Sequence, residues 1–593
     1  MRSTAAVAVA LAFVASVAVR AQDAEVFSRH VVVAQEGNAS DVGREVLRRG
    51  GNAIDAAVAT AFALAVTHPA AGNIGGGGFI VAFDAASGRV RTFDFRETAP
   101  AAATPTMYLG ADGKLVRHSR AGARAAGVPG TVRGLGLAHS LMGKRPWVEL
   151  VRPAARLARE GFVVSETLAR SLNAQLRPRR ADGKEEGKGK DGGLVARRDD
   201  LGTGSDRLVD FPESVTAFAR ADGARWTAGD RLLQPDLAAT LDRIAAVGAD
   251  EFYTGETAAR LVRYMADRNG LVIASDLAAY RAIERAPVHV TFRGHDVYGM
   301  GPVSSGGIVV AEMLGILETF DLKAEGPRSA RTLHRVTEAQ RRAYFTRATR
   351  LADPAFVSIP VAELVSKERA RALALSITEQ ATASASLAPF PVEGAEGTET
   401  THLSTLDGAG NAVALTYTLE EGYGSKAVVG GAGFLLNNEM GDFNVIPGRT
   451  DASGRIGTPP NLIAPGKRML SSMAPTLVLK DGKVRLVTGS PGGRTIPNTV
   501  LWVVLNVLEF GLEPRAAIDA PRTHQAWFPD VLTLEGEGES WGPAVLSSLR
   551  ARGHTLRFTD IQGDAQSIVV SPVSGRIHGI ADKRRVTEKA SGD

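Results

Sequence analysis

Two stretches in the second half of the chain alternate between apolar and polar residues, which is the pattern of paired strands. Thr400–Asp407 and Asn411–Leu419 place leucine, valine and tyrosine at odd positions and histidine, serine, alanine and threonine at even ones. The turn sequence Asp-Gly-Ala-Gly joins them, so we expect a hairpin. With the turn centred on Ala409, Thr418 lies opposite Thr400 with its hydroxyl on the same face. A slip of one residue in the turn would remove this pair.

The remainder of the chain mixes helical and strand patterns. Helical patterns dominate from 235 to 375, and strands dominate beyond 399. The expected elements outside the hairpin are strands at 30–34 and 288–298 and helices at 41–49, 53–66, 498–510 and 543–552. The helix at 53–66 is rich in alanine on all sides, which indicates a buried helix with Asn52 as its cap.

The N-terminal stretch has the pattern of a secretory signal. Arg2 provides the positive start, residues 5–19 an apolar run too short for a comfortable membrane span, and Val19-Arg20-Ala21 a small-residue cleavage site. A retained membrane anchor is the alternative, which Arg20 and the short run disfavour. We therefore expect cleavage after Ala21 and an exported protein, periplasmic or extracellular, with no membrane contact after signal removal.

Composition excludes several classes of function. The 593 residues include no cysteine, which rules out disulfides, thiol nucleophiles and cysteine-bound metals. The formal charge is +5, and loss of two arginines with the signal leaves +3, so nucleic acid is not an expected partner. The eleven histidines are dispersed and no zinc-helix or calcium-loop motif occurs, so neither a metal nor another cofactor is expected.

Thr400 directly follows a linker of small residues, proline and glutamate at 383–398, and the chain divides near 399. Most threonine pairs in strands only fill space with β-branched side chains. A threonine that becomes a chain N-terminus can instead use its own α-amine as general base, and it then needs no separate histidine. Thr400 is therefore a candidate nucleophile.

Two glycine-rich segments indicate special backbone geometry. The four successive glycines at 75–78 indicate close backbone approach and unusual dihedral angles, whereas a phosphate loop would require a following helix and lysine. Gly489-Ser490-Pro491-Gly492-Gly493 does not match the G-x-S-x-G elbow of serine hydrolases. It offers two adjacent backbone amides suited to an oxyanion hole, and a plain turn is the alternative.

A set of charged and hydroxyl side chains can recognise the head group of an α-amino acid. The candidates for its ammonium group are Glu420, Glu439 and Asp442, and those for its carboxylate are Arg96, Ser471 and Ser472. Other interpretations stay open at this point, a surface ion pair for Arg96-Glu97 and a turn for the two serines. Spacing alone does not bring these residues together in space.

Eight motifs occur together and in one order, and through them the chain resembles the γ-glutamyltranspeptidases. They are Gly72–Phe79, Phe95–Pro100, Val128–Thr131, Pro302–Gly307, Thr400–Ser404, Leu435–Phe443, Leu470–Met473 and Gly489–Gly493. The resemblance covers nearly the whole mature chain except a charged, glycine-rich insertion at 177–205, which we expect to be a solvated loop.

The resemblance implies an α+β fold, the four-layer αββα sandwich of the Ntn-hydrolases, made as one precursor that cuts itself between Glu399 and Thr400. The expected parts are a signal at 1–21, a large (α) subunit at 22–399 and a small (β) subunit at 400–593, which remain together as a heterodimer. The implied activity transfers the γ-glutamyl group of glutathione and related compounds, through an acyl-enzyme on Thr400, to water or to an amino acid or peptide acceptor. No cofactor is implied.

The resemblance also implies a role for each candidate residue. Thr400 is the nucleophile, and Thr418 supports it. The amides of Gly492 and Gly493 donate to the oxyanion. The α-carboxylate is bound by Arg96, Ser471 and Ser472, and the α-amino group by Glu439 and Asp442. At Glu420 many members carry asparagine, so an amide becomes an acceptor-only carboxylate that we expect to bind ammonium more strongly. The segment 444–467 has the length of the lid that covers the site in some members. It lacks the gating tyrosine that is often found in the lid, and Ser453 lies near the position of that tyrosine. A site without a closed lid is open, which favours water as acceptor.

Two further functions are kept as alternatives. The first is a sister activity on the same fold, acylase action on glutaryl β-lactams or amidase action on poly-γ-glutamate. A glutaryl substrate lacks the ammonium group, so turnover of the two substrate types separates them. The second is a non-catalytic exported binding protein, which would need no free amine at Thr400.

Overall fold

The computed structural model describes residues 25–116, 119–177, 206–387, 400–450 and 456–593. Several expectations fall outside the described residues: the signal at 1–21, nearly all of the insertion at 177–205, the linker from 388 to 398 with Glu399, and Ser453. The start of the linker is described, and Ser384–Leu387 forms a short 3-10 helix. No helix within the described ranges combines the length and the apolar character needed to cross a membrane.

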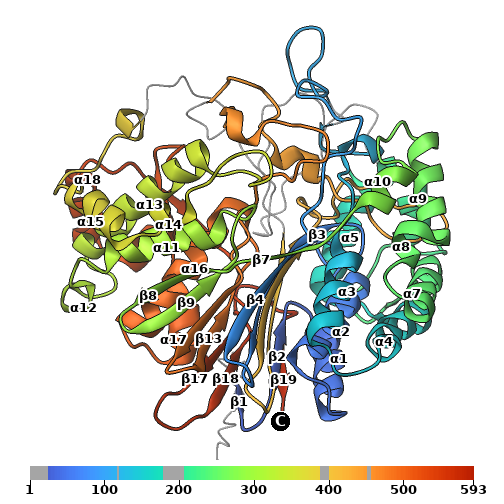
Figure 1. The fold of residues 1–593 in the computed structure, drawn as a ribbon, viewed down its shortest axis with the longest axis horizontal. Helices are drawn as coiled ribbons and strands as arrows, with labels where there is room; N and C mark the ends of the chain where they lie inside the picture. Colours follow the sequence, from blue (N-terminus) through green and yellow to red (C-terminus); the bar gives the residue numbers. More distant parts are fainter. Residues whose placement is uncertain (1–24, 117–118, 178–205, 388–399, 451–455) are drawn as a thin grey trace, which may run out of the picture.

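Two seven-stranded sheets lie face to face, and each has helices on its outer side, so that Figure 1 shows four layers from left to right. Every strand pair within the two sheets is antiparallel. The α+β class and the αββα order of layers are therefore confirmed.

The first sheet carries the predicted hairpin at its centre. In spatial order its strands are β19 (Lys589–Gly592), β2 (Val31–Ala34), β10 (Thr401–Leu406), β11 (Ala412–Thr418), β3 (Gly77–Asp84), β4 (Arg89–Asp94) and β7 (Ile283–Arg285). The second sheet consists of β1 (Glu25–Phe27), β18 (Ile577–Ile580), β17 (Ser567–Val570), β13 (Lys483–Thr488), β12 (Thr476–Lys480), β9 (His295–Gly299) and β8 (Val288–Phe292). Segments from before and after residue 400 thus interleave in both sheets.

Two small sheets lie outside these layers. They are β14 (Thr523–His524), β15 (Leu532–Glu535) and β16 (Leu556–Thr559), and β5 (Phe162–Val163) with β6 (Arg231–Leu232).

The helices divide between the outer layers by position in the sequence (Figure 1). Those on the side of the hairpin sheet are α1 (Gly37–Arg48), α2 (Ala53–Thr67), α3 (Thr131–Met142), α4 (Trp147–Glu160), α5 (Glu166–Leu176), α6 (Pro212–Phe218), α7 (Pro235–Val247), α8 (Glu251–Thr254), α9 (Glu256–Asp267) and α10 (Ala274–Ala279). Those on the other side are α11 (Gly306–Leu317), α12 (Leu322–Glu325), α13 (Ala330–Arg350), α14 (Val361–Leu364), α15 (Lys367–Leu375), α16 (Ile496–Val504), α17 (Pro514–Asp519) and α18 (Pro543–Ala551).

Helix α2 forms as the sequence predicts. The Asn52 side chain accepts the amide of Asp55 at 3.0 Å, and the Asp55 carboxylate accepts the amide of Asn52 at 3.0 Å, which is a capping box. All fifteen residues of α2 are buried, since α1, α4 and the hairpin sheet surround it. Two other elements differ in detail: the strand expected at 288–298 is the β8–β9 hairpin, and the helix expected at 498–510 ends in a π-helical turn, Leu505–Glu509.

The β10–β11 hairpin has the predicted register. Thr401 pairs with Tyr417 and Leu406 with Ala412, and the Asp407 carboxylate closes the turn by accepting the amides of Ala409 and Asn411. Both faces of these strands are buried, because helices cover one face and the second sheet covers the other. The odd-numbered apolar residues pack toward the helices, and the even-numbered positions face the second sheet.

The four glycines at 75–78 approach another strand closely, as the sequence predicts. A Cβ atom on Gly76 would stand 2.0 Å from the carbonyl oxygen of Thr418, so no side chain fits there. The expectation of unusual dihedral angles is wrong, because none of the four has a positive φ. Close packing against β11, rather than backbone strain, requires glycine at this place.

Candidate active site

Thr400 lies directly before β10 and is only 5% exposed. Its Oγ1 is 3.4 Å from the Oγ1 of Thr418, which confirms that the two hydroxyls face each other across the hairpin. The Thr418 hydroxyl also accepts the backbone amide of Glu420 at 2.8 Å, which fixes its orientation. The catalytic roles of the two threonines stay predictions.

Asn73 holds the end of β11 in place, and sequence reasoning missed it. Its Nδ2 donates to the carbonyl oxygen of Thr418 at 2.9 Å, and its Oδ1 accepts the amide of Gly76 and the hydroxyl of Thr131. The signal was present, since an asparagine lies two residues before the glycine run. The side chain thus links the glycine segment to the supporting threonine.

His402 lies two residues after Thr400 in the same strand. Its Nδ1 is 2.8 Å from the hydroxyl of Thr416, and its Nε2 is 3.1 Å from the hydroxyl of Ser404. Complete burial lowers the pKa of His402 to about 3, so the ring is neutral at neutral pH. Since neighbouring hydroxyls occupy both nitrogens, this histidine orders the strand rather than serving as a ready base.

The loop Gly489–Gly493 follows β13 and packs on β10. A Cβ atom on Gly489 would stand 2.3 Å from the His402 ring, so the backbone of the loop touches the strand that starts at Thr400. Gly492 and Gly493 have φ values of 129° and 54°, the left-handed region that favours glycine. Their role as oxyanion donors stays a prediction.

Arg96 is fully buried just beyond the end of β4 and forms ion pairs with Glu439 and Asp442. Its Nε donates to the carbonyl oxygen of Met469 at 3.2 Å, and its Nη2 to that of Leu470 at 3.4 Å. A surface ion pair is therefore excluded. The fold brings the predicted carboxylate binder and both predicted ammonium binders into one cluster.

We expected Arg96 to bind the carboxylate of a ligand and Glu439 and Asp442 to bind its ammonium group. In the structure Arg96 instead contacts the two acids directly. Burial by itself would lower the pKa of Arg96, but the carboxylates of Glu439 and Asp442 raise it. Burial also raises the pKa of Glu439 well above its ordinary value. Buried charges must be compensated, so these side chains neutralise one another here. A ligand carrying both an ammonium and a carboxylate group can replace the internal pairs with equivalent ones.

Ser471 and Ser472 directly follow the two carbonyl groups that Arg96 contacts. The carbonyl oxygen of Ser471 accepts the amide of Ser305 at 2.8 Å and its hydroxyl at 2.6 Å. The Ser471 hydroxyl accepts the amide of Met473 at 3.2 Å, and Ser472 is buried. The serines thus lie beside the charged cluster, and their contact with a carboxylate stays a prediction.

Glu97 is a member of the cluster that sequence reasoning missed. It is 0% exposed, 3.6 Å from the Arg96 guanidinium, and within the described residues neither of its oxygens has a hydrogen-bond donor. Burial raises the pKa of Glu97 to about 8. The sequence shows only an Arg-Glu pair, which is far more often a surface pair.

Glu420 follows β11 in a left-handed conformation, with φ of 82°. Burial, and then the carboxylate of Glu421, raise the pKa of Glu420 well above its ordinary value. We expected an acceptor-only carboxylate, whereas a raised pKa favours the protonated acid, which can donate as well. A Cβ atom on Gly441 would stand 4.0 Å from its Oε1, which places Glu420 beside the segment that carries Asp442.

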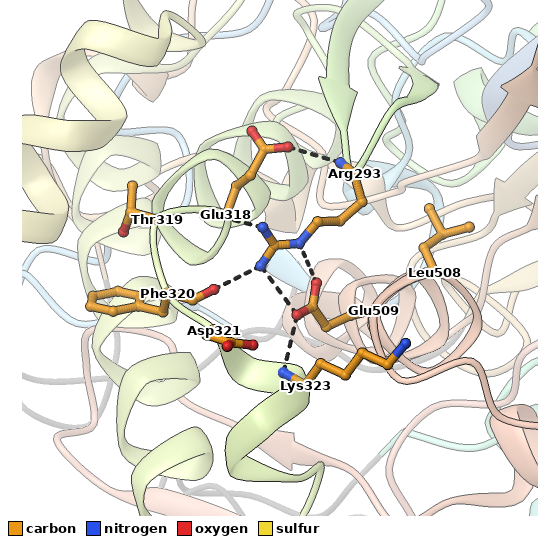
Figure 2. A pocket seen from close by; sticks show the side chains of 8 residues that line it. All are labelled: Arg293, Glu318, Thr319, Phe320, Asp321, Lys323, Leu508 and Glu509. Carbon is orange, nitrogen blue, oxygen red and sulfur yellow. Dashed lines mark hydrogen bonds and ion pairs between the residues drawn. The ribbon is translucent and has the colours of Figure 1, made fainter.

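A cavity of about 510 Å³ lies at another place, and no predicted site residue lines it. Figure 2 shows Arg293 at its centre, where this residue contacts Glu509 and the backbone of Glu318 and Phe320. These contacts hold the connection between α11 and α12 in place. Within the described residues no group of three or more histidine, aspartate or glutamate side chains is arranged to hold a metal ion.

Comparison with known proteins agrees with this geometry. The family model described as Gamma-glutamyltranspeptidase matches residues 39–592. A glutathione hydrolase proenzyme of Escherichia coli (strain K12) is 40% identical over 95% of this chain and 91% of its own length. A relative with the same name from Pseudomonas aeruginosa is 41% identical over 91% of this chain and 90% of its own length.

Solved structures are similar as well. A cephalosporin acylase from Bacillus halodurans superposes with a TM-score of 0.80 at 26% identity, covering 96% of this chain and 97% of that chain. A γ-glutamyltranspeptidase chain from Helicobacter pylori is 37% identical with a TM-score of 0.52, covering 57% of this chain and 89% of that chain. From the family match and the identity to these relatives, the chain belongs to the γ-glutamyltranspeptidase family.

Proposed function

We propose that the protein is an autoprocessed γ-glutamyltransferase and hydrolase that cleaves the γ-glutamyl amide of glutathione and related compounds. Relatives that are about 40% identical and span nearly the whole chain are named glutathione hydrolase proenzymes, which supports both the substrate and the processing. The observation that carries the proposal is the hydroxyl pair of Thr400 and Thr418, 3.4 Å apart at the start of β10.

Processing comes first. The Thr400 hydroxyl attacks the carbonyl carbon of Glu399, the peptide C–N bond breaks, and the α-amine of Thr400 is released as an ester forms on its oxygen. Water then hydrolyses this ester, leaving a carboxylate on Glu399 and a free hydroxyl and amine on Thr400. The large chain then ends at Glu399, and the small chain begins with its nucleophile.

Catalysis uses the same oxygen. The free amine takes the proton of the Thr400 hydroxyl as the oxygen attacks the γ-glutamyl carbonyl, and the protonated amine then gives that proton to the leaving amine. The amides of Gly492 and Gly493 stabilise the oxyanion, and Thr418 orients the nucleophile. Water, or the amine of an amino acid or peptide, then attacks the acyl-enzyme and restores the hydroxyl.

The charged cluster supplies specificity for the glutamyl head group. Arg96, with the hydroxyls of Ser471 and Ser472, binds the α-carboxylate, while Glu439, Asp442 and Glu420 bind the α-ammonium group. Its buried arginine and acids support this role, because a zwitterionic ligand satisfies both signs of charge in a site that excludes water.

The two chains remain together as a heterodimer after the cut. The interleaving of strands from before and after residue 400 in both sheets supports this, since neither part retains a complete sheet alone. The H. pylori chain, which matches 57% of this chain with 89% of its own length, fits a separate large chain. The apolar N-terminal run supports export to the periplasm or beyond.

A second candidate is acylase action on glutaryl amides, because an acylase ACY 1 proenzyme from Pseudomonas sp. (strain SE83) is 35% identical and covers 93% of this chain. Turnover of γ-glutamyl and glutaryl anilides by the purified protein tests both functions. We expect the γ-glutamyl anilide to be cleaved with a much higher kcat/KM, because only it carries the ammonium group. A preference for the glutaryl anilide would overturn the proposal.

A further inference from the structure

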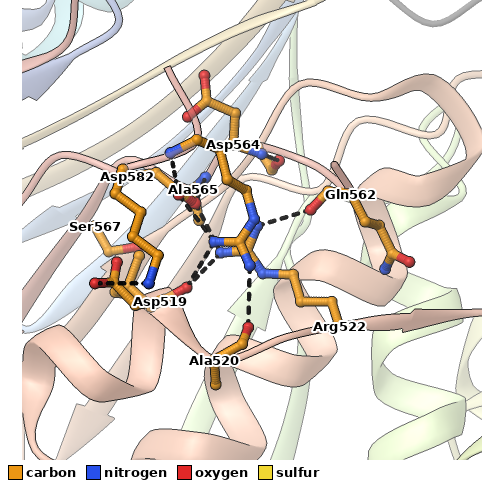
Figure 3. Close-up of polar contacts among 12 residues, drawn as sticks. Asp519, Ala520, Arg522, Gln562, Asp564, Ala565, Ser567 and Asp582 are labelled. Atoms are coloured by element: carbon orange, nitrogen blue, oxygen red, sulfur yellow. Dashed lines mark hydrogen bonds and ion pairs between the residues drawn. The ribbon is translucent and has the colours of Figure 1, made fainter. Parts of the chain in front are cut away.

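A second group of buried acids lies behind the loop that carries Gly492 and Gly493. Its three acids are Asp564, Asp582 and Glu588. Figure 3 shows Asp582 beside the guanidinium of Arg522, and the Asp582 carboxylate accepts the amide of Ala565 at 2.9 Å. Arg522 and Arg584 both pair with Asp582, at 2.7 and 2.9 Å, so the charge of this acid is compensated.

Asp564 is joined directly to the glycine loop. Its backbone amide donates to the Ser490 hydroxyl at 2.8 Å, and that hydroxyl donates to the carbonyl oxygen of Pro491 at 2.7 Å. The neighbouring Gly563 is so close that its Cα would be 3.7 Å from a Cβ atom on Gly492. A shift of Asp564 therefore moves the backbone that presents the two glycine amides.

The Asp564 carboxylate is also joined to the strand beside the nucleophile. It accepts hydrogen bonds from the side-chain amides of Gln35 and Gln566, the latter at 3.0 Å. Gln35 directly follows β2, whose last residue, Ala34, pairs with Leu403 of β10. Asp564 thus connects the Thr400 end of the hairpin sheet to the loop that follows β13 in the second sheet.

Glu588, which directly precedes β19, faces the Asp564 carboxyl. It is 6% exposed, and within the described ranges neither of its oxygens has a hydrogen-bond donor at good distance and angle, although the side-chain amide of Gln566 lies near it. The cation beside the pair is Arg585, whose Nε is 3.6 Å from Asp564. Two facing carboxyl groups in a buried place hold one proton between them, because that proton lets Glu588 donate to Asp564 and removes one negative charge.

The surrounding groups favour this singly protonated form. Burial, and then the nearby Asp564, raise the pKa of Glu588 well above its ordinary value, and Asp582 acts in the same direction. His68 lies near Arg585, and burial lowers the pKa of this histidine to about 3, so it adds no positive charge at neutral pH. One guanidinium therefore faces two carboxyl groups.

We propose that Glu588 and Asp564 share one proton and act as a positioning pair, holding the Ser490–Gly493 loop in register with Thr400. This inference rests on the proposed function, in which Gly492 and Gly493 stabilise the oxyanion. Loss of the shared proton places two negative charges against each other, displaces Asp564 and moves the loop. The chemical step slows as a result, while the head-group cluster around Arg96 keeps its affinity.

The test compares Glu588→Gln with Glu588→Leu. A glutamine amide donates to Asp564 as the protonated acid does and cannot ionise, so we expect Glu588→Gln to keep the neutral-pH kcat. As pH rises through the raised pKa of Glu588, kcat of the wild type should fall relative to Glu588→Gln. Glu588→Leu should lower kcat by about tenfold or more with little change in KM, since misplaced oxyanion donors cost rate rather than binding. Glu539→Gln, an exposed site in the same subunit, is the matched control and should follow the wild type throughout.

Processing, measured by gel, and melting temperature establish that each variant is folded. If Glu588→Leu fails to fold, the ratio of the kcat of Glu588→Gln to that of the wild type, measured as a function of pH, still tests the positioning pair. A ratio that stays constant with pH overturns the positioning pair, as does an unchanged kcat in a folded Glu588→Leu protein. Failure of the proposed function is a separate outcome, since the wild type would then turn over no γ-glutamyl substrate at all.

Discussion

The nucleophile hairpin and the head-group cluster are built by opposite means. The two facing side chains of the hairpin, Thr400 and Thr418, are uncharged and lie 18 residues apart in the sequence, and strand pairing sets their geometry. The cluster is charged, and Arg96 and Glu439 are 343 residues apart in the sequence. A local hairpin can place a reacting oxygen accurately with little electrostatic cost, whereas recognition of a zwitterion requires buried charges that only the complete fold can hold together.

The largest expected effect is that of Thr400→Ala, which tests the nucleophile of the hairpin. Removal of the hydroxyl should abolish both processing and turnover, with a loss of at least about 10⁴-fold in kcat, since the nucleophile itself is gone. Gel analysis and an anilide assay measure both effects. The control is Thr401→Val, at the neighbouring buried position in β10, which should still be processed. An active, uncut Thr400→Ala protein would refute the nucleophile.

Arg96→Gln is the corresponding test on the cluster side. It leaves the buried Glu439 and the partly exposed Asp442 without their cation, so we expect KM for the γ-glutamyl substrate to rise about 100-fold and the unfolding free energy to fall by roughly 3–5 kcal/mol. Steady-state kinetics and thermal unfolding measure the two effects.

Arg91→Gln is its matched control, because Arg91 lies on β4 near Arg96 and pairs with the exposed Glu284 of the neighbouring strand β7. Such a pair contributes at most about 1 kcal/mol. Equal effects of the two substitutions would contradict a special role for the buried cluster.

Thr418→Val separates orientation of the nucleophile from recognition of the head group. It removes the hydroxyl 3.4 Å from Thr400 but keeps the shape of the side chain. We expect kcat to fall about 10- to 100-fold with KM nearly unchanged, because a loosely held nucleophile slows chemistry rather than binding. Thr418→Ser keeps the hydroxyl and should restore most of the rate. A rise in KM without loss of kcat would assign Thr418 to the cluster instead.

The last prediction concerns stability and its change with pH. Burial raises the pKa of Glu97 from 4.5 to about 8, so between these values the folded chain holds a proton that the unfolded chain has lost. The free energy of unfolding therefore falls as pH rises toward 8, by at most about 1.4 kcal/mol for each pH unit. Glu97→Gln removes this dependence, so its melting temperature relative to the wild type should increase between pH 5 and pH 9. A constant difference would show that Glu97 is ionised throughout.

The hairpin could be predicted from the sequence because all its information is local. Alternation fixes the faces, the Asp-Gly-Ala-Gly turn fixes the register, and Thr418 opposite Thr400 follows. The glycine run likewise signals close packing, but which chain segment it packs against does not appear in the sequence. The four-layer fold came from the resemblance of ordered motifs rather than from periodicity.

The cluster could not be assembled in this way. In the sequence, Glu97 looks like one partner of a surface ion pair with Arg96. Nothing near residue 97 shows that both side chains are buried. The direct pairing of Arg96 with Glu439 depends on long-range packing, as does the raised pKa of Glu420, because burial sets the cost of charge. Asn73 and the Asp564–Ser490 link are similarly contacts between distant segments.

The most direct test of the central claim is the N-terminal residue of the smaller chain in active, purified protein. We expect two chains, with the smaller one beginning at Thr400 and its amine free. Full activity in a single uncut chain, or in a smaller chain that begins at another residue, would contradict Thr400 as the self-released nucleophile.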